Sequence, residues 1–577
     1  MVKAVSSLRR DWSRRRRSSP DDLAELGVDS PLLAQLLLNR GITTPADAQA
    51  FLEPPRPVAP ALSEMAGLDA AVQRIERALT AGQKIVVYGD YDVDGLSGST
   101  VLERTLLALG GRAEVFIPHR DRDGYGLNSD VLRALSEQEA GLVITVDCGV
   151  TAAAEVAVAG SIGLDIVVTD HHDVPAVLPE AVAVVNPHRP DCPYPFTQLA
   201  GAGVALKVAQ ALIARRLSPA GAATLEPALF QLAALGTVSD VMPLVGENRA
   251  IVRHGLRALN QRPIPGLAAL VRRAGLTRPW VDAEDIAFRL GPRLNAAGRI
   301  SEASVTQRLL ATRDPAEAER LADQLEALNS QRRELADAAL DDARASVLAA
   351  ERPGSPADRP AAPAVVVQSS YPSGVLGLVA VRLVEETGRA VAVLERTDGM
   401  SRGSVRVPEG LSAIEAVSAC AEYLLRYGGH RGAAGFAIEA SQIDAFSLDF
   451  VAAFGRQSPV VVSDDGPVAD CRLRPSTISE ELLDLLARLG PFGQAAPEPL
   501  FETGPLVVRE ARVVKERHLR LKLSGERRLL VAIGFNGAAE VPRVGSEIDV
   551  LYRARPNVWQ GERRAELDLA GWRPSSA

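Results

Sequence analysis

Five short apolar runs, separated by stretches with helical patterning, constrain the fold of this chain more than any other feature. They are rich in Val and Ile and lie at residues 84–88, 113–117, 142–146, 165–169 and 182–185. Runs that stay apolar throughout indicate strands buried on both faces. Such strands, alternating with helices, form a parallel sheet that helices cover on either side. We therefore predict an α/β fold with a doubly wound parallel sheet.

The rest of the chain divides by composition into further segments. Residues 199–275 and 314–350 have helical patterns, and 352–363 is a linker rich in Pro. The C-terminal part is predicted to be an OB-like β-barrel. It has a helical pattern at 479–489, followed by short strands at 505–514, 518–523, 529–533 and 547–552. The predicted units are an N-terminal leader with a helix at 31–40 (1–62), a catalytic domain (63–310), a connecting helix (311–352), a smaller α/β domain (364–455) and the barrel domain (456–577).

Composition excludes several classes of protein. The 577 residues carry a formal net charge of −8, which argues against a polycation that coats nucleic acid. Four scattered cysteines form neither a disulfide framework nor a Cys-based zinc site. No apolar run reaches the roughly 18 residues of a membrane span, and no apolar segment follows the N-terminal arginines as in a signal peptide. We expect a cytoplasmic protein.

Three carboxylates directly follow the first predicted strand, at Asp90, Asp92 and Asp94. The pattern Asp-x-Asp-x-Asp-Gly also opens an EF-hand loop. The twelfth position of such a loop would be Val101 instead of a bidentate Glu, and a strand precedes instead of a helix. The EF-hand reading is therefore disfavoured.

Acidic or imidazole groups also follow later apolar segments, at Asp147, at Asp170-His171-His172 and at Asp240. Each Asp alone could cap the following helix. Capping does not require three acids at alternate positions or a His pair, and ligands of open α/β sheets bind at the carboxyl ends of the strands. Clustered carboxylates need a cation, and oxygen ligands with one or two imidazoles suit Mn²⁺ or Mg²⁺. We predict two divalent ions bridged by a shared Asp, an arrangement suited to phosphoester hydrolysis.

These residues resemble the DHH phosphoesterase superfamily, which is named after the triplet found here at 170–172. Longer segments are similar to those of its RecJ family, exonucleases that digest single-stranded DNA from 5′ to 3′. They are 186–195, 199–204, 236–240, 291–299, 428–435, 490–493 and 497–501. The resemblance extends from about residue 60 to 570. It departs from the family pattern at 371–375, which lacks the usual His, at Ala495-Ala496 and at 403–407.

The resemblance implies a set of metal ligands and a mechanism. The implied ligands are Asp90, Asp92, Asp94, Asp147, His171 and Asp240, with Asp90 the least certain match because many relatives have His there. Asp147 is the expected bridge, and His172 is expected to contact phosphate or orient a ligand. The catalytic set is thus Asp92, Asp94, Asp147, His171, His172 and Asp240. The expected reaction is two-metal hydrolysis that releases 5′-mononucleotides.

The resemblance also implies residues that bind the DNA end. Tyr125, Arg299, Ser404 and Arg406 are expected around the 5′-phosphate, and Arg293, Asn295 and His430 are expected to contact DNA. Charge counts are consistent with this: residues 249–299 hold ten arginines against three acids, and 509–528 hold eight basic residues against three acids. We predict that both stretches line the DNA path.

Two other functions compete with the exonuclease. One is a nanoRNase, cyclic-dinucleotide phosphodiesterase or pyrophosphatase of the same superfamily, and the other is a non-catalytic DHH replication scaffold. The first group generally lacks the barrel and the 291–299 segment, and the second loses metal ligands that are all present here. The expected partners are single-stranded DNA, a helicase and the single-strand-binding protein, with the chain a monomer associated with the nucleoid when it acts.

Overall fold

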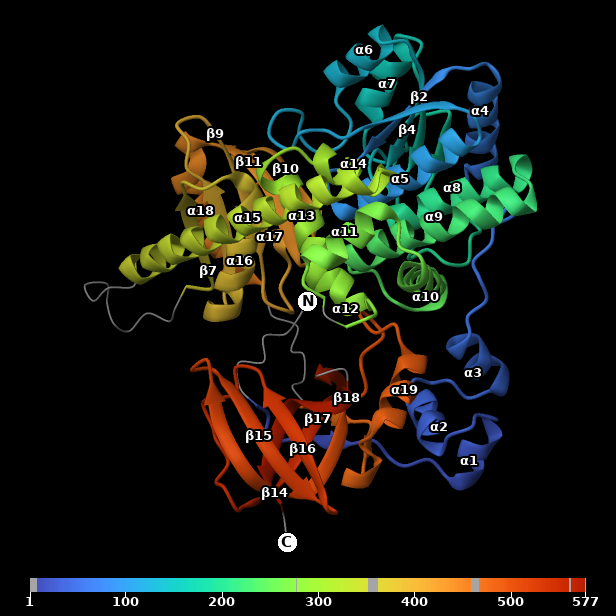
Figure 1. Ribbon diagram of the computed structural model, residues 1–577. Coiled ribbons are helices and arrows are strands. Elements are labelled where there is room, and N and C mark those ends of the chain that lie inside the picture. Colours follow the sequence, from blue (N-terminus) through green and yellow to red (C-terminus); the bar gives the residue numbers. More distant parts are fainter. Residues whose placement is uncertain (1–7, 277, 351–361, 458–465, 560–561, 576–577) are drawn as a thin grey trace.

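The computed structural model describes residues 8–276, 278–350, 362–457, 466–559 and 562–575, which build three units around separate cores (Figure 1). The linker expected at 352–363 falls almost entirely outside these residues. Among the described residues, no helix combines the length and apolar character needed to cross a membrane.

The first unit contains a five-stranded, fully parallel sheet, as the apolar runs predict. Its order is β3-β2-β4-β5-β6. The bounds are β2 (Lys84–Gly89), β3 (Arg112–Phe116), β4 (Ala140–Val146), β5 (Asp165–Thr169) and β6 (Ala183–Val185). The chain order reverses between β2 and β4, and such a switch point opens a crevice at the carboxyl ends of the strands.

Helices cover both faces of this sheet, so it is doubly wound. On one face, Ile85 and Val87 pack against α4 (Leu68–Thr80), α5 (Val93–Ala108) and α8 (Gly201–Arg216). On the other, Val86 and Tyr88 pack with α6 (Ser129–Glu137) and α7 (Ala153–Ser161) (Figure 1). The period of two along β2 divides its side chains between these two cores.

Further helices complete this unit and lead out of it. They are α9 (Pro219–Ser239), α10 (Gly246–Gln261), α11 (Pro265–Arg273), α12 (Ala283–Asp285), a π-helical turn (Ile286–Leu290), α13 (Gly291–Ile300), α14 (Ser304–Ala311) and α15 (Pro315–Ala350). The helical region predicted at 199–275 and the long helix predicted at 314–350 are both confirmed. Helix α15 runs from the first unit to the second (Figure 1).

The second unit is a five-stranded mixed sheet with order β10-β11-β9-β8-β7. Its strands are β7 (Ala364–Ser369), β8 (Ala390–Glu395), β9 (Met400–Arg406), β10 (Leu424–His430) and β11 (Ala433–Glu439). Helix α16 (Ser373–Thr387) packs between this sheet and α15, while α17 (Ala413–Ser418) and α18 (Ile443–Arg456) pack on the other core. Helix α15 therefore shares a core with each of two units.

The third unit is a closed β-barrel. Its strands are β14 (Phe501–Val514), β15 (His518–Gly525), β16 (Arg528–Gly534), β17 (Glu547–Trp559) and β18 (Glu562–Pro574), and the β14–β17 pairing closes it. The sequence reasoning missed β18, whose alternating polar residues give no continuous apolar run. The short strands β12 (Val468–Ala469) and β13 (Cys471–Arg472) and helix α19 (Glu480–Leu489) precede the barrel.

The N-terminal segment is part of the barrel unit instead of a separate leader. Helices α1 (Pro20–Glu25), α2 (Pro31–Leu38) and α3 (Pro45–Leu52) share one apolar core with α19 and the barrel. Strand β1 (Ser13–Arg14) pairs in parallel with β12. The partners lie more than 400 residues away in sequence, so no local pattern could reveal this packing.

Candidate metal centre and DNA-end site

The carboxylates after β2 converge at the carboxyl edge of the parallel sheet. Asp90 directly follows the strand, and Asp92 is the N-cap of α5, where it accepts hydrogen bonds from the amides of Asp94 and Gly95. Asp94 lies in the first turn of α5 and is buried. One of the three acids therefore caps this helix, and capping does not account for the other two.

The neighbouring segments deliver the remaining groups. Asp147 follows β4 with a left-handed backbone (φ 62°), which is a strained conformation for a residue other than Gly. His171 and His172 follow β5, and Asp240 caps the C-terminus of α9. The sequence-predicted groups thus come together from four elements, as the strand-end argument predicts.

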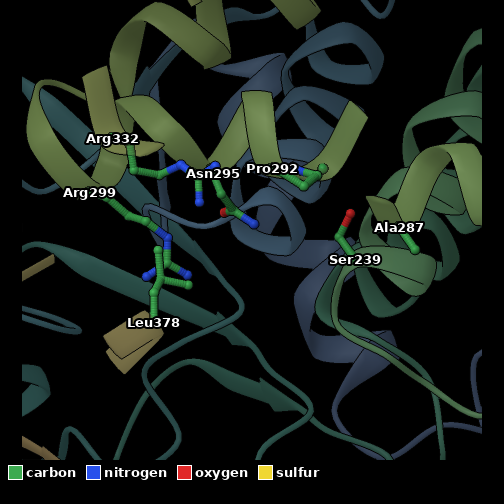
Figure 2. Close-up of a pocket in the computed structure, with 8 residues that line it drawn as sticks. Ser239, Ala287, Pro292, Asn295, Arg299, Arg332 and Leu378 are labelled. Atoms are coloured by element: carbon green, nitrogen blue, oxygen red, sulfur yellow. The ribbon is translucent and has the colours of Figure 1, made fainter. Parts of the chain in front are cut away.

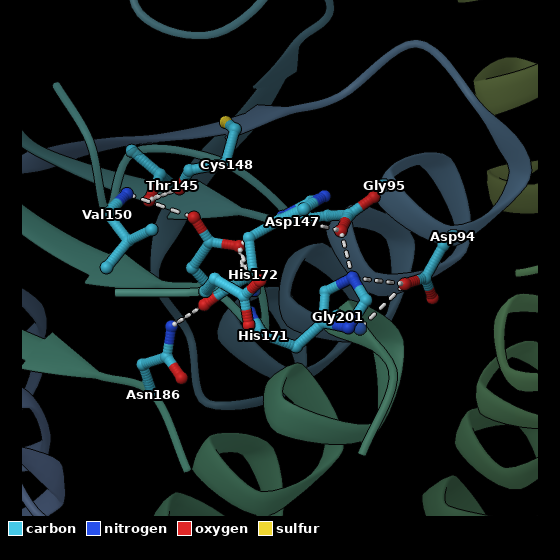
Figure 3. A network of polar contacts seen from close by, with 12 residues as sticks. Asp94, Gly95, Thr145, Asp147, Cys148, Val150, His171, His172, Asn186 and Gly201 are labelled. Carbon is cyan, nitrogen blue, oxygen red and sulfur yellow. Dashed lines mark hydrogen bonds and ion pairs between the residues drawn. The ribbon is translucent and has the colours of Figure 1, made fainter. Parts of the chain in front are cut away.

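His171 lies at the centre of the cluster, between Asp147 and Asp94 (Figure 3). Its Nε2 is 2.9 Å from Asp147 Oδ1, 3.7 Å from Asp240 Oδ2 and 3.8 Å from Asp94 Oδ2. Three sets of side chains have ligand atoms close enough together to share an ion. They are Asp90, Asp92 and Asp147; Asp94, His171 and Asp240; and Asp147, His171 and His172.

The cluster fits divalent cations. In an octahedral site with bonds of about 2.1 Å, adjacent ligand atoms lie about 3 Å apart. The buried Oδ1 of Asp90 accepts no hydrogen bond from any described residue, and Asp147 Oδ1 has only the imidazole of His171 at 2.9 Å. Buried, unsatisfied carboxylate oxygens are costly unless a cation binds them. Asp147 belongs to two of the three sets, as a bridging ligand would.

Burial and mutual repulsion raise the pKa values of the carboxyls. Burial, followed by the charge of Asp92, raises the pKa of Asp90 to about 8 and that of Asp94 to about 7. Burial, followed by the charge of Asp94, raises the pKa of Asp240 to about 8. Burial lowers the pKa of His171 to about 4, so its imidazole is neutral and available as a ligand.

Two glycines allow helices to approach the cluster closely. The amides of Gly201 and Ala202, at the N-terminus of α8, donate to Asp94 at 2.6 and 2.9 Å. A methyl group at Gly201 would lie 2.6 Å from Asp147 Cβ, and one at Gly236 would lie 2.3 Å from Asp94 Oδ1. Both glycines belong to segments quoted for the family resemblance, but sequence reasoning gave them no role.

Asp170 orients the His pair instead of joining the ligand sets. Its Oδ1 accepts from the amides of His171 and His172 and lies 2.7 Å from His172 Nδ1, while its Oδ2 accepts from the amide of Val150. Burial opposes the charged form of His172, but the hydrogen bond and charge of Asp170 outweigh burial and raise the pKa of His172 to about 9. Asn186 fixes the backbone by donating to His172 O.

The second unit brings His430 to the same crevice. Its ring is stacked on His172 with the centroids 6.4 Å apart. The exposed ring of Tyr125 lies edge-on to His172, also at 6.4 Å. Two of the residues predicted to contact DNA therefore lie beside His172 at the metal cluster.

Other predicted DNA-binding residues lie around a cavity of about 140 Å³ between α13, α15 and α16. Asn295 and Arg299 line it (Figure 2), and Asn295 also accepts from the amide of Val93, beside Asp92 and Asp94. Arg299 donates to Gly374 O of α16. Ser404 and Arg406 are hydrogen-bonded to each other on β9, and Arg406 packs against Gly377 of α16.

Arg293 points elsewhere. Its guanidinium pairs with Glu326 of α15 and donates to Arg289 O, so its side chain joins two helices. Its assignment to DNA stays a prediction.

Several arginines of the basic stretch 249–299 have partners that are distant in sequence. Arg253 and Arg257 lie near Glu53, and Arg272 and Arg273 pair with Glu319 of α15. Arg249 is buried and donates to the carbonyl of Phe51 in α3 and to three carbonyls at the end of α19, those of residues 489–491. Several of these arginines therefore have protein partners that a local count of charges does not include, and the DNA path along this stretch stays a prediction.

Comparisons with known proteins agree on one family. The DHH family N-terminal domain matches residues 84–237, the DHHA1 domain matches 362–455 and the RecJ OB domain matches 469–570. A protein of Bacillus subtilis named single-stranded-DNA-specific exonuclease RecJ is 33% identical over 98% of this chain and 70% of its own length. The protein of the same name from Salmonella typhimurium is 33% identical over 96% of this chain and 97% of its own length.

Solved structures give the same result. The crystal structure of RecJ from Thermus thermophilus in complex with Mn²⁺ matches with a TM-score of 0.80 and 32% identity, covering 99% of this chain and 80% of that one. The complex of the same protein with Mg²⁺ matches with a TM-score of 0.74 and 31% identity, covering 99% and 79% of the two chains.

Proposed function

This chain belongs to the RecJ family of single-stranded-DNA-specific exonucleases, and we propose that it digests single-stranded DNA from the 5′ end, releasing 5′-mononucleotides during DNA repair and recombination. The observation that carries this proposal is the convergence of five aspartates and His171 at the carboxyl edge of one parallel sheet. The cofactors are divalent cations, Mn²⁺ or Mg²⁺.

Two sets of side chains hold the two ions in this proposal. Asp90, Asp92 and Asp147 form one set, and Asp94, His171 and Asp240 form the other, with Asp147 between them. Bound ions of this kind supply Lewis acidity, which lowers the pKa of water and offsets the charge of a phosphodiester.

The protein's own part is to fix these ligands in advance. Helix α8 directs two amides at Asp94, and Asp170 holds the ring of His172 through its Nδ1. Supporting contacts of this kind orient metal ligands and nearby donors before substrate arrives. His172 then contacts the phosphate, together with His430 from the second unit.

The DNA end binds in the crevice between the first two units. Arg299 and Arg406 have no carboxylate within ion-pair distance among the residues that the structure describes, unlike most arginines of 249–299. Tyr125, Ser404 and these two arginines surround the 5′-phosphate in this proposal, and Asn295 positions the backbone between Asp92 and Asp94. Arginine suits this task because its planar fork binds two phosphate oxygens at once.

The barrel holds the strand behind the end, as OB folds bind single-stranded nucleic acid. We propose that the chain acts as a cytoplasmic monomer, associated with the nucleoid while it works. A helicase and the single-strand-binding protein would supply the exposed strand that the crevice accepts. These partners follow from the family resemblance.

The test is digestion of long single-stranded oligonucleotides labelled separately at each end, with duplex DNA and dinucleotides in parallel, in Mn²⁺ and in Mg²⁺. We expect mononucleotides from the 5′ end of single strands and little digestion of duplex. Release only from short oligomers would instead indicate a nanoRNase, and no hydrolysis would indicate a scaffold.

Matched variants test the metal site itself. Asp92→Ala and His171→Ala should abolish hydrolysis while the protein stays folded, because each removes a ligand. Asp130→Asn, on the exposed side of α6, should retain activity. Nuclease activity that persists in purified His171→Ala would refute the assignment.

A further inference from the structure

A second cavity, of about 420 Å³, lies between the C-terminal half of α5 and the end of α14. Both helices contribute to the core of the first unit (Figure 1). The metal ligand Asp94 lies in the first turn of α5, and Arg104 follows ten residues later, about 15 Å further along the helix. This cavity shares no lining residue with the metal centre or with the cavity around Asn295 and Arg299. Its lining consists of Glu103, Arg104, Leu107, Ala108, Ala311 and Arg313.

Arg104 is a buried cation of this cavity whose charge is not matched. Its side chain is 7% exposed, and Nη2 donates to Leu310 O and Ala311 O at the end of α14. Its Nε is buried without a hydrogen-bond partner, and no described carboxylate lies within ion-pair distance of the guanidinium. Two carbonyls account for one nitrogen of the fork, but an unmatched buried charge is costly and favours the binding of an anion.

Arg313 adds a second cation to the same cavity. It is exposed, and it has no ion pair with the carboxylates in the described part of the chain. The acid nearby on α15, Glu317, is already used, because its two oxygens accept from Arg308 and Thr312. Burial, followed by the charge of Arg313, lowers the pKa of Arg104, and the charge of Glu103 offsets this only in part.

The remaining lining offers one acceptor and an apolar wall. Glu103 accepts from Gln307 Nε2 at 2.8 Å and forms no ion pair with Arg104 or Arg313 among the residues described. Leu107 is 46% exposed, which is unusual for a leucine in a helix of the core, and Ala108 and Ala311 lie beside it in the lining. A ligand of this cavity would therefore carry an anionic group, a donor and an apolar part.

The charge and the volume together indicate the class of this ligand. Guanidinium groups bind phosphate through their planar forks, and a phosphate monoester carries a charge of about −1.5 to −2 at pH 7. A bare phosphate ion would fill only a small part of the cavity, whose volume falls in the range of about 300–1,000 Å³ typical of sites for small organic ligands. A sugar and a base supply the donors and the flat apolar surface that the rest of the lining accepts.

We infer that the cavity between α5 and α14 is a second ligand site, which binds a nucleoside monophosphate. The phosphate contacts Arg104 and Arg313, while the sugar or base packs on Leu107 and donates to Glu103. This inference goes beyond the proposed exonuclease function, although that reaction would release molecules of this class. Since α5 also carries Asp92 and Asp94, a bound mononucleotide would contact the helix that holds two of the metal ligands.

Hydrogen–deuterium exchange of the full chain in EDTA, titrated with deoxyadenosine monophosphate, tests the site. Added mononucleotide should protect the backbone amides of 103–108 and 307–313, and peptides over 291–299 report separately on the crevice. Arg313→Gln and Leu107→Glu should each raise the concentration needed for this protection at least about 10-fold, because one removes a charge and the other adds a repelling one. Both residues are exposed, so both variants should fold. Arg320→Gln, exposed on α15 and outside the lining, is the matched control and should resemble the wild type.

Inorganic phosphate and deoxyadenosine, tested in the same way, identify the parts of the ligand that matter. Each should protect 103–108 at least about 10-fold less effectively than the mononucleotide, because each lacks half of the contacts. The inference is overturned if protection appears only at 291–299, if Arg313→Gln is protected like the wild type, or if inorganic phosphate protects as well as the mononucleotide. A wild-type protein that hydrolyses no DNA would refute the proposed function instead, because this measurement requires no hydrolysis.

Discussion

The amide of Gly201 donates a 2.6 Å hydrogen bond to Asp94, and a methyl group on the same residue would lie 2.6 Å from Asp147 Cβ. One position thus fixes one carboxylate and sets the space available to another. Gly201→Ala should therefore displace either α8 or Asp147, although Ala normally favours a helix. We expect Mn²⁺ affinity, measured by isothermal titration calorimetry, to fall at least about 10-fold, with a matching loss of activity.

Gly160→Ala is the matched control for this change, because Gly160 is an exposed residue of α7 with nothing near its Cβ position. Its metal affinity should equal that of the wild type. Unchanged Mn²⁺ binding by Gly201→Ala would show that α8 does not set the geometry of the site.

Asp170→Asn should impair catalysis more than metal binding. The carboxylate accepts from donors on both oxygens, so an amide nitrogen would face an N–H whichever way it turns. The substitution also removes the charge that raises the pKa of His172. We expect kcat to fall about 10- to 100-fold, with Mn²⁺ affinity reduced much less. The control Asp130→Asn should have the kcat and the Mn²⁺ affinity of the wild type. Wild-type kcat in Asp170→Asn would contradict a role for His172 in the reaction.

Arg249→Lys should lower stability without lowering DNA affinity. Arg249 stacks on Phe51 and donates to carbonyls of residues 51 and 489–491, a set that a lysine ammonium cannot reproduce. The expected loss is about 2 kcal/mol of unfolding free energy, seen as a lower midpoint in calorimetry. Arg257→Ala, which is exposed and 3.6 Å from Glu53, should change little. An unchanged midpoint with weakened DNA binding would instead place Arg249 on the DNA path.

Glu498→Gln should change how stability depends on pH. Burial, opposed by Arg555 and Arg553, raises the pKa of Glu498 to about 7, and Arg555 also pairs with Glu284 and Asp568. This native pKa lies above the ordinary value near 4.5, so between about pH 4.5 and 7 the Glu498 carboxyl is protonated in the native state but ionised in the unfolded state. The free energy of unfolding therefore falls as pH rises through this range.

The variant lacks this titration, so its stability relative to the wild type should rise by up to about 3 kcal/mol between pH 4.5 and 8. Thermal midpoints of both proteins at these two pH values test this, with the exposed Glu385→Gln as control. A difference between variant and wild type that is constant with pH would contradict the raised pKa.

Much of the fold followed from local patterns. Apolar runs at β2, β4 and β5 and the helical pattern of α15 depend on neighbours within a few residues, so composition and period were enough to predict them. Strand β18 was missed because charged residues recur through its first half, which leaves no apolar run to mark it.

The sequence by itself determined which groups stand at the sheet edge, because the carboxyl ends of parallel strands necessarily meet there. Asp92, Asp147 and His171 could therefore be predicted to converge. Only the tertiary structure decided what surrounds them. It placed the α8 amides on Asp94, joined Arg249 to the carbonyls of residues 51 and 489–491, and brought Arg332 beside Arg299. Charge and hydrogen bonding act through space, and the partners of these groups lie up to several hundred residues away along the chain.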